Sequence, residues 1–150
     1  MWMIASCFVA AIVSALLPWV NAELMLVAVA GRLTSFSELS AVVLAITAGQ
    51  VLGKSGLYWI ARRTSHSTPN GRFGRAVDRW RVACDSRHRS TQTMMTLSAV
   101  FGLPPFYVTT VAAGALRVHF GRFLVSAVVG RLVHFSAVGL APLLFHAAYP

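Results

Sequence analysis

Acidic residues are scarce in this chain. Asp and Glu together account for only 4 of its 150 residues, against 13 Lys and Arg, which gives a formal net charge of +9. Charged residues of both signs make up 11% of the chain and hydrophobic residues 57%. Soluble domains carry about 25% charged residues. The composition therefore excludes an ordinary soluble domain and indicates an integral membrane protein.

Cysteine and histidine are also too few and too scattered to form a reactive or metal-binding centre. Cys7 lies in an apolar stretch and Cys84 in a basic segment, so they give neither a disulfide framework nor metal-ligand spacing. The five histidines are equally dispersed. The sequence contains no Ser/His/Asp or Cys/His set and no phosphate-binding loop. We therefore expect no metal, no cofactor and no enzymatic activity.

Most of the excess positive charge lies in one segment. Residues 62–89 contain eight arginines and only two acids, Asp78 and Asp85. Short loops rich in Arg remain on the cytoplasmic side of a membrane. The segment therefore predicts a cytoplasmic loop, which explains the charge without a nucleic-acid partner. Its arginines are Arg62, Arg63, Arg72, Arg75, Arg79, Arg81, Arg87 and Arg89.

A proline divides the apolar N-terminal region. Residues 1–17 are uncharged and fall short of the roughly 20 apolar residues that a spanning helix needs. Pro18 follows, and Glu23–Gly31 forms a second apolar stretch. Because proline removes a backbone donor and disrupts a helix, we interpret the region as a re-entrant hairpin, or alternatively as a short span with a returning leg. No Lys or Arg precedes the apolar stretch, which argues against a cleaved signal peptide.

The same pattern returns in the second half of the chain. Residues 92–103 and 106–116 are each about half a span long, and Pro104 and Pro105 separate them. In lipid such a break is tolerated only where protein or a water cavity covers the freed backbone groups. We therefore expect a second re-entrant hairpin. A second basic patch follows it, formed by Arg117, His119 and Arg122.

Each broken element precedes a long apolar segment. Ala41–Ala61 is long enough to span a membrane and ends in a pair of arginines, and Phe123–His146 is long enough for a tilted span. Gly49 and Gly53 in the first segment have the spacing of small residues that lets another helix approach closely. We expect these two glycines to serve helix packing.

The two halves of the chain are therefore alike. We predict a single all-α membrane domain over residues 1–150, with a first repeat over 1–63 and a second over 91–150. Residues 64–90 form the cytoplasmic loop between them. Within it, Arg75–Arg89 is either an amphipathic helix on the lipid surface or a solvated loop of weak helicity. Hairpins of opposite orientation would make the halves inverted repeats, an architecture that places transporter binding sites near the midplane.

Three stretches resemble the DedA family, also called the VTT or SNARE-associated membrane domain. They are Pro18–Glu23, Gly49–Arg62, and Ala112–Arg117 followed by Phe123. The resemblance implies two opposed re-entrant elements in a multi-pass protein of the bacterial inner membrane. It also implies movement of lipids such as undecaprenyl phosphate between leaflets, coupled to protons in some members. Lys54 stands where the family usually has an acid, and the arginines that normally flank the second proline element are absent.

Four ionisable residues are the candidates for a transport or substrate-binding site: Glu23, Lys54, Arg117 and Arg131. Ionisable groups at membrane depth are costly and usually face a pathway. Long Lys and Arg side chains can instead reach the interface, whereas the shorter Glu23 cannot. We expect Glu23 to be protonated or to lie beside Lys54, or otherwise beside Arg131. His134 shares a helix face with Arg131, and we expect it to be a packed polar neighbour rather than a proton relay.

These features predict a transporter or lipid translocase, of flippase or scramblase type, for an anionic lipid or small solute. A proton or the membrane potential would drive it. Glu23 would titrate or pair with a cation, and Lys54, Arg117 and Arg131 would contact the anionic headgroup. The alternative is a non-transporting assembly or envelope-maintenance protein that packs against partner membrane proteins through its Gly-rich helix. Membrane lipids are the expected partners, and a homo-oligomer is compatible with both alternatives.

Overall fold

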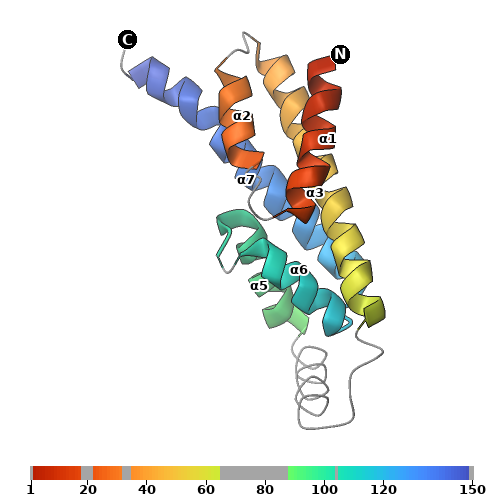
Figure 1. Ribbon diagram of the computed structural model, residues 1–150. Coiled ribbons are helices and arrows are strands. Elements are labelled where there is room, and N and C mark those ends of the chain that lie inside the picture. The colour runs from red at the N-terminus through yellow and green to blue at the C-terminus, as the bar shows by residue number, and fades with distance from the viewer. Residues whose placement is uncertain (1, 18–21, 32–34, 65–87, 104, 149–150) are drawn as a thin grey trace, which may run out of the picture. The chain divides into compact units, whose positions relative to one another are not determined.

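The computed structural model describes residues 2–17, 22–31, 35–64, 88–103 and 105–148, which form helices and no strand (Figure 1). The helical expectation is therefore confirmed for this part of the chain. Two helices are long, α3 (Phe36–Thr64) and α7 (Phe120–Ala148). The shorter helices are α1 (Trp2–Leu16), α2 (Ala22–Ala30), α5 (His88–Phe101) and α6 (Phe106–Ala115).

The two long helices include the segments that the sequence predicts as spans. By length and composition, α3 and the Phe120–Ala141 part of α7 could cross a membrane. Each helix begins a few residues before the predicted span. Ser35 sets the start of α3 as an N-cap, because its Oγ accepts the backbone N–H of Ser37 at 3.3 Å. The carbonyl of His119 sets the start of α7 by accepting the N–H of Arg122 at 3.0 Å.

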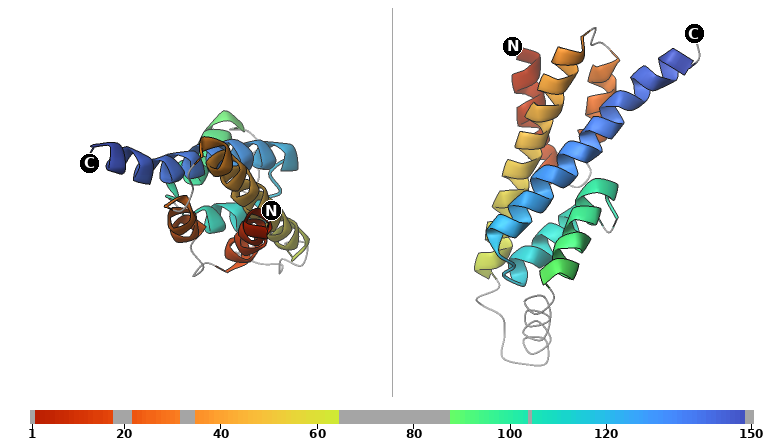
Figure 2. Two further views of the ribbon diagram at one scale, coloured as in Figure 1. Left: turned by 90° about the horizontal axis from the view of Figure 1, so that it is seen from above. Right: turned by 180° about the vertical axis from the view of Figure 1, so that it is seen from behind.

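The shorter helices form two hairpins. α1 packs against α2, and α5 packs against α6 (Figure 2). A helix rises about 1.5 Å per residue, so α1 and α2, with 15 and 9 residues, reach roughly 22 and 14 Å. By the same rise, α5 and α6, with 14 and 10 residues, reach roughly 21 and 15 Å. The hydrocarbon core of a bilayer is about 30 Å thick, so none of the four helices is long enough to cross it.

The chain divides into two compact units. Unit 1 contains residues 1–53 and 131–150, and unit 2 contains residues 54–130. Each unit therefore combines one hairpin, the start of the long helix that follows it and the end of the other long helix. Both boundaries fall directly after a glycine and before a cation, at Gly53-Lys54 and at Gly130-Arg131. The two units therefore contain the same set of structural elements. The predicted division of the sequence into repeats over 1–63 and 91–150 stays a prediction.

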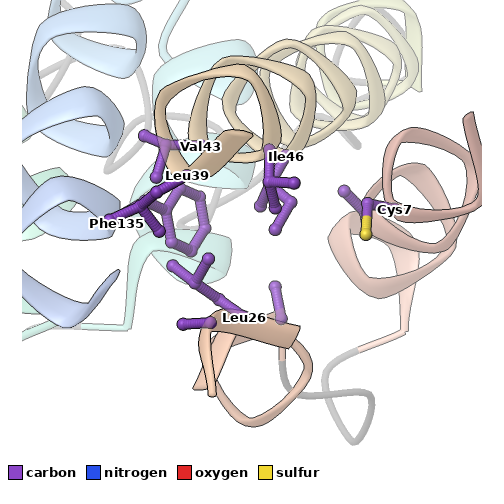
Figure 3. Packing of buried hydrophobic residues seen from close by; sticks show 10 residues of the cluster. Cys7, Leu26, Leu39, Val43, Ile46 and Phe135 are labelled. Atoms are coloured by element: carbon purple, nitrogen blue, oxygen red, sulfur yellow. The ribbon is translucent and has the colours of Figure 1, made fainter. Parts of the chain in front are cut away.

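An apolar core joins the helical segments of unit 1 (Figure 3). Leu39, Val43 and Ile46 recur at spacings of three and four residues, so they share one face of α3. This face meets Leu26 of α2 and Phe135 of α7, both fully buried. The core therefore fixes α2 and the second part of α7 on the same side of α3. The cluster is completed by Cys7, Ala11, Ala22, Ala30 and Val42.

Two glycines let α1 lie directly against α3. A Cβ atom added at Gly49 would lie 2.5 Å from the carbonyl oxygen of Phe8 and 2.9 Å from the Cβ of Ala11. A Cβ atom added at Gly53 would lie 2.5 Å from the Cβ of Ala15. These distances leave no room for a side chain. The small-residue spacing in α3 is therefore used for contact with α1 of the same chain.

Aromatic rings fill the centre of unit 2. The buried ring of Tyr58 stacks on Phe123 with 5.0 Å between centroids. Glycines again permit close contacts. A Cβ added at Gly114 of α6 would lie 2.3 Å from the carbonyl oxygen of Tyr58, and one added at Gly130 of α7 would lie 2.3 Å from the Cβ of Ala99 in α5. Each hairpin leg in unit 2 is thus held against a long helix at a glycine.

The break between α5 and α6 occurs where the sequence predicts it. Gly102 follows the end of α5 with a φ of +74°, a left-handed conformation that glycine adopts without steric cost. Pro105 is the N-cap residue of α6. The legs are joined by a side-chain hydrogen bond between Ser98 Oγ and Thr109 Oγ1, which lie 2.8 Å apart.

Some predicted features fall on residues that the structure does not describe. Pro18 and Pro104 lie outside the described residues, as do most of the loop over 64–90 and of the proposed amphipathic helix Arg75–Arg89. These features stay predictions. The loop is bounded in the structure by the end of α3 and the start of α5.

Candidate functional site

Glu23 is the second residue of α2. Ala22, Leu26 and Ala30 are buried and recur every four residues, so they form the face of α2 that packs into unit 1. Glu23 lies beside this face and close to the helix N-terminus, where the helix dipole favours a negative charge. Its side chain is 45% exposed. The carboxylate therefore lies at the edge of the core rather than inside it.

The Glu23 carboxylate pairs with His134 on α7. Glu23 Oε1 and His134 Nε2 are 2.8 Å apart, which is a normal hydrogen-bond length. The His134 side chain is only 14% exposed. Its ring lies edge-on to the neighbouring Phe135, with 5.4 Å between centroids. Because Phe135 is buried in the core, its packing also positions the imidazole.

Arg131 adds a fixed positive charge beside this pair. It precedes His134 by three residues and therefore shares its face of α7. Its guanidinium carbon lies 5.6 Å from the centroid of the Phe135 ring, a cation–π geometry. The charge of Glu23 interacts electrostatically with Arg131. We refer to Glu23, Arg131 and His134 together as the Glu23 cluster.

The Glu23–His134 contact contains a proton. A hydrogen bond between a carboxylate oxygen and an imidazole nitrogen requires a proton between them. The pair therefore joins α2 to α7 through this proton, and Arg131 lies on the same face of α7.

Lys54 lies in unit 2 in a comparable position. It is buried, and its Nζ lies 5.0 Å from the centroid of the Tyr107 ring. Tyr107 is the second residue of α6, just as Glu23 is the second residue of α2. In each unit, a cation that directly follows a boundary glycine therefore interacts with the second residue of a short helix. The predicted Glu23–Lys54 pair would join the two units, and it stays a prediction.

Arg117 terminates α6 in unit 2. Its φ of +56° is left-handed, which is uncommon for a residue other than glycine, Asn or Asp. Its N–H donates to the carbonyl of Gly114 and the N–H of Val118 donates to the carbonyl of Ala113, both at 3.0 Å. This pair of bonds is a Schellman C-cap. The cap therefore places the Arg117 cation at the turn between α6 and α7.

The structure thus separates the four predicted site residues into two sets. Glu23 and Arg131 lie together in unit 1, whereas Lys54 and Arg117 belong to unit 2. His134 was not predicted as the partner of Glu23, because its only sequence signal is the shared helix face with Arg131. Among the described residues, no three His, Cys, Asp or Glu side chains gather as a metal site would require.

A protein family model matches most of the helical region. The VTT domain family model matches residues 17–141. The match includes the Glu23 cluster, all of α2 to α6 and most of α7. No curated protein and no solved structure matches the chain.

Proposed function

Because the chain belongs to the VTT domain family, the DedA or SNARE-associated domain, we propose that it is a transporter or lipid translocase of the bacterial inner membrane. The proposed substrate is an anionic lipid or a small anionic solute. Membership of this family and two helices that could cross a bilayer make the chain a membrane protein. The proposal adds to this a substrate, a driving force and a site.

The observation that carries the proposal is the Glu23 cluster. Ionisable groups within apolar membrane helices are costly and mark substrate or ion pathways. The 2.8 Å contact between Glu23 and His134 holds a proton next to the charge of Arg131. A second proton would remove the negative charge of the pair and so favour an anionic headgroup beside Arg131, and loss of that proton would release it. Proton movement and anion binding would then be coupled at one site.

The proposed architecture is a pair of inverted repeats, each a re-entrant hairpin followed by a spanning helix. The lengths of α1, α2, α5 and α6 support it, because none of them can cross the hydrocarbon core. Units 1 and 2 also contain the same set of elements, as expected for two repeats that each contribute the end of a long helix to the other unit. In such an architecture transporter binding sites lie near the midplane.

The alternative, an assembly protein that packs through its Gly-rich helix, receives less support. Gly49 and Gly53 would be its contact surface, but α1 of the same chain already covers both. Of the three glycines in α3, only Gly56 has open space where a side chain would be. The helix face that the alternative requires is therefore occupied.

Reconstitution into liposomes tests the proposal. A fluorescent phosphatidylglycerol and a fluorescent phosphatidylcholine, each quenched from outside, report movement between leaflets. We expect the protein to accelerate movement of the anionic reporter, and Glu23→Gln to slow it about tenfold, or about 1.4 kcal/mol in the barrier. Glu38→Gln is the matched control, since Glu38 is exposed in the first turn of α3. Equal rates for the wild type and Glu23→Gln would exclude the Glu23 cluster as the transport site.

A further inference from the structure

We propose that Thr47 and Gln50 of α3 bind a hydroxyl group inside unit 1. The hydroxyl belongs to a water molecule or to the glycerol headgroup of an anionic phospholipid, two ligands that share this chemistry. The lipid source rests on the proposed function, whereas the water source would hold for a protein that moves no lipid. We refer to the two side chains as the Thr47–Gln50 site.

Both side chains of the site are buried, and each has an unpaired polar atom. Thr47 and Gln50 are each only 4% exposed. Gln50 Nε2 donates to Ser14 Oγ of α1 at 2.5 Å, which holds the amide in place. Gln50 Oε1 and Thr47 Oγ1 have no hydrogen-bond partner among the described residues. Buried polar atoms are nearly always paired in folded proteins, with protein groups or with bound water, because an unpaired one is unfavourable. A bound group is therefore expected at these two atoms.

The two unpaired atoms favour a hydroxyl group over an ion. The oxygen of the Gln50 amide only accepts hydrogen bonds, whereas the Thr47 hydroxyl can both donate and accept. If the amide turned over, its nitrogen and not its oxygen would be the unpaired atom, and it would need an acceptor. A hydroxyl group can donate to the oxygen or accept from the nitrogen, so it fits both orientations. A cation or an anion would fit only one of them.

The Thr47–Gln50 site faces the part of α7 that carries the Glu23 cluster. Val43 packs toward α7, since its Cγ2 would lie 3.6 Å from a Cβ added at Gly139. Thr47 lies one turn further along the same face of α3. Because α3 and α7 run in opposite directions within unit 1 (Figure 2), this turn faces the earlier part of α7, which contains Phe135 and Arg131. A hydroxyl group bound here would lie on the same side of α3 as the Glu23 cluster.

Solid-state NMR of the protein in phosphatidylglycerol vesicles tests the site. Magnetisation transfer from water or headgroup protons to the Gln50 side-chain amide reports a bound hydroxyl group. We expect this signal in the wild type. It should be at least about twofold weaker in Thr47→Val, because a buried water needs roughly two to four polar partners and would lose one.

Thr110→Val is the matched control for this experiment. Thr110 is also buried, but its hydroxyl donates to the carbonyl of Phe106 at 2.7 Å. The Gln50 signal of this variant should equal that of the wild type. Absence of transfer to Gln50 in the wild type, or equal signals in the wild type and Thr47→Val, would overturn the site.

Exchange of the lipid distinguishes the two sources of the hydroxyl. Phosphatidylmethanol has the same phosphodiester charge as phosphatidylglycerol but no hydroxyl in its headgroup. A Gln50 signal that persists in phosphatidylmethanol vesicles identifies water as the ligand, and a signal that is lost identifies the headgroup. No step of the experiment requires transport, so its result stays distinct from that of the liposome assay.

The thermal unfolding midpoint gives a second measure, in micelles that contain phosphatidylglycerol. A buried hydroxyl without a partner destabilises a protein, so its removal in Thr47→Val would raise the midpoint. A hydroxyl that is bonded to a ligand stabilises it, and we therefore expect the midpoint to fall by about 2–4 °C. Circular dichroism checks that the variant folds. A higher midpoint in the folded variant would overturn the site.

Discussion

Glu23 Oε1 lies 2.8 Å from His134 Nε2, which joins α2 to α7 across 111 positions of the sequence. The contact connects the short helix after the first predicted break to the second half of the last helix. Arg131 on the same face of α7 interacts with the same carboxylate. Removing one member of the pair therefore changes both the packing of unit 1 and the charge beside Arg131.

A double-mutant cycle on Glu23 and His134 should show strong coupling. We expect Glu23→Gln and His134→Gln each to lower the free energy of unfolding in detergent. The free energy of unfolding of the double variant should fall by less than the sum of the two single losses, with a coupling energy of about 0.5–3 kcal/mol. Reversible unfolding followed by circular dichroism measures this energy. As a control, Glu38→Gln combined with His134→Gln should be additive. Additivity in the Glu23 cycle would show that the two groups do not interact.

Substitution of Gly49 should destabilise unit 1. In Gly49→Ala the new Cβ would lie 2.5 Å from a carbonyl oxygen of α1, so the backbone of one helix must move. Overpacking of this kind costs about 1–3 kcal/mol. The measurement is the thermal unfolding midpoint in detergent, which should fall by several degrees.

Gly56→Ala is the control for this prediction. Gly56 lies in the same helix, but its substituent would meet no atom within 4 Å. Replacing a glycine in a helix by alanine is favourable by about 0.8–1 kcal/mol. The thermal unfolding midpoint of Gly56→Ala should therefore stay the same or rise. A fall of equal size in both variants would mean that α1 does not lie against Gly49.

Ser126→Ala should weaken the contact between α5 and α7 in unit 2. The Ser126 hydroxyl accepts a hydrogen bond from Gln92 at 2.8 Å and one from Thr96 at 3.1 Å. Side-chain hydrogen bonds between membrane helices contribute about 0.6 kcal/mol each on average. Ser126→Ala should therefore lower the free energy of unfolding by about 1 kcal/mol. Ser136→Ala, at an exposed position of the same helix, should have little effect, and equal effects would contradict the assignment.

The proposed re-entrant geometry of the second hairpin predicts a labelling pattern. Gln92 Nε2 donates to the carbonyl of Arg122 at 3.0 Å, so the start of α5 lies beside the start of α7. Cysteines placed at positions 92 and 118, in a variant without Cys7 and Cys84, should therefore react from the same side of the membrane. Reaction from opposite sides would mean that the two legs form one kinked span.

By the positive-inside rule, positions 70 and 149 should react from opposite sides.

Local features of the fold could be predicted from the sequence. Length and hydropathy of contiguous residues identified α3 and α7, and Pro104 and Pro105 predicted the break between α5 and α6. Ser35, a residue type typical of helix N-caps, caps α3 through its hydrogen bond to Ser37. The glycine spacing in α3 predicted a close helix approach. It did not identify α1 as the partner, because spacing describes one surface of a contact and not the other.

The arrangement of the site could not be predicted in the same way. No periodic rule links Glu23 to His134, because their contact depends on how α7 packs on the core formed by Leu26 and Phe135. The charge pattern of the family favours Lys54 as the partner of Glu23, and this pairing stays a prediction. The charge of Glu23 acts on Arg131, the second candidate. Which cation approaches an acid is decided by tertiary packing, and a single sequence does not contain that information directly.

The central claim is that the Glu23–His134 pair operates in lipid or anion transport, and an exchange of the two residues tests it most directly. In the liposome assay with fluorescent phosphatidylglycerol, Glu23→Gln and His134→Gln should each slow movement between leaflets about tenfold. The exchanged variant, Glu23→His with His134→Glu, retains one carboxylate and one imidazole beside Arg131. It should recover most of the wild-type rate. Wild-type rates in both single variants, at matched amounts of folded protein, would contradict the account.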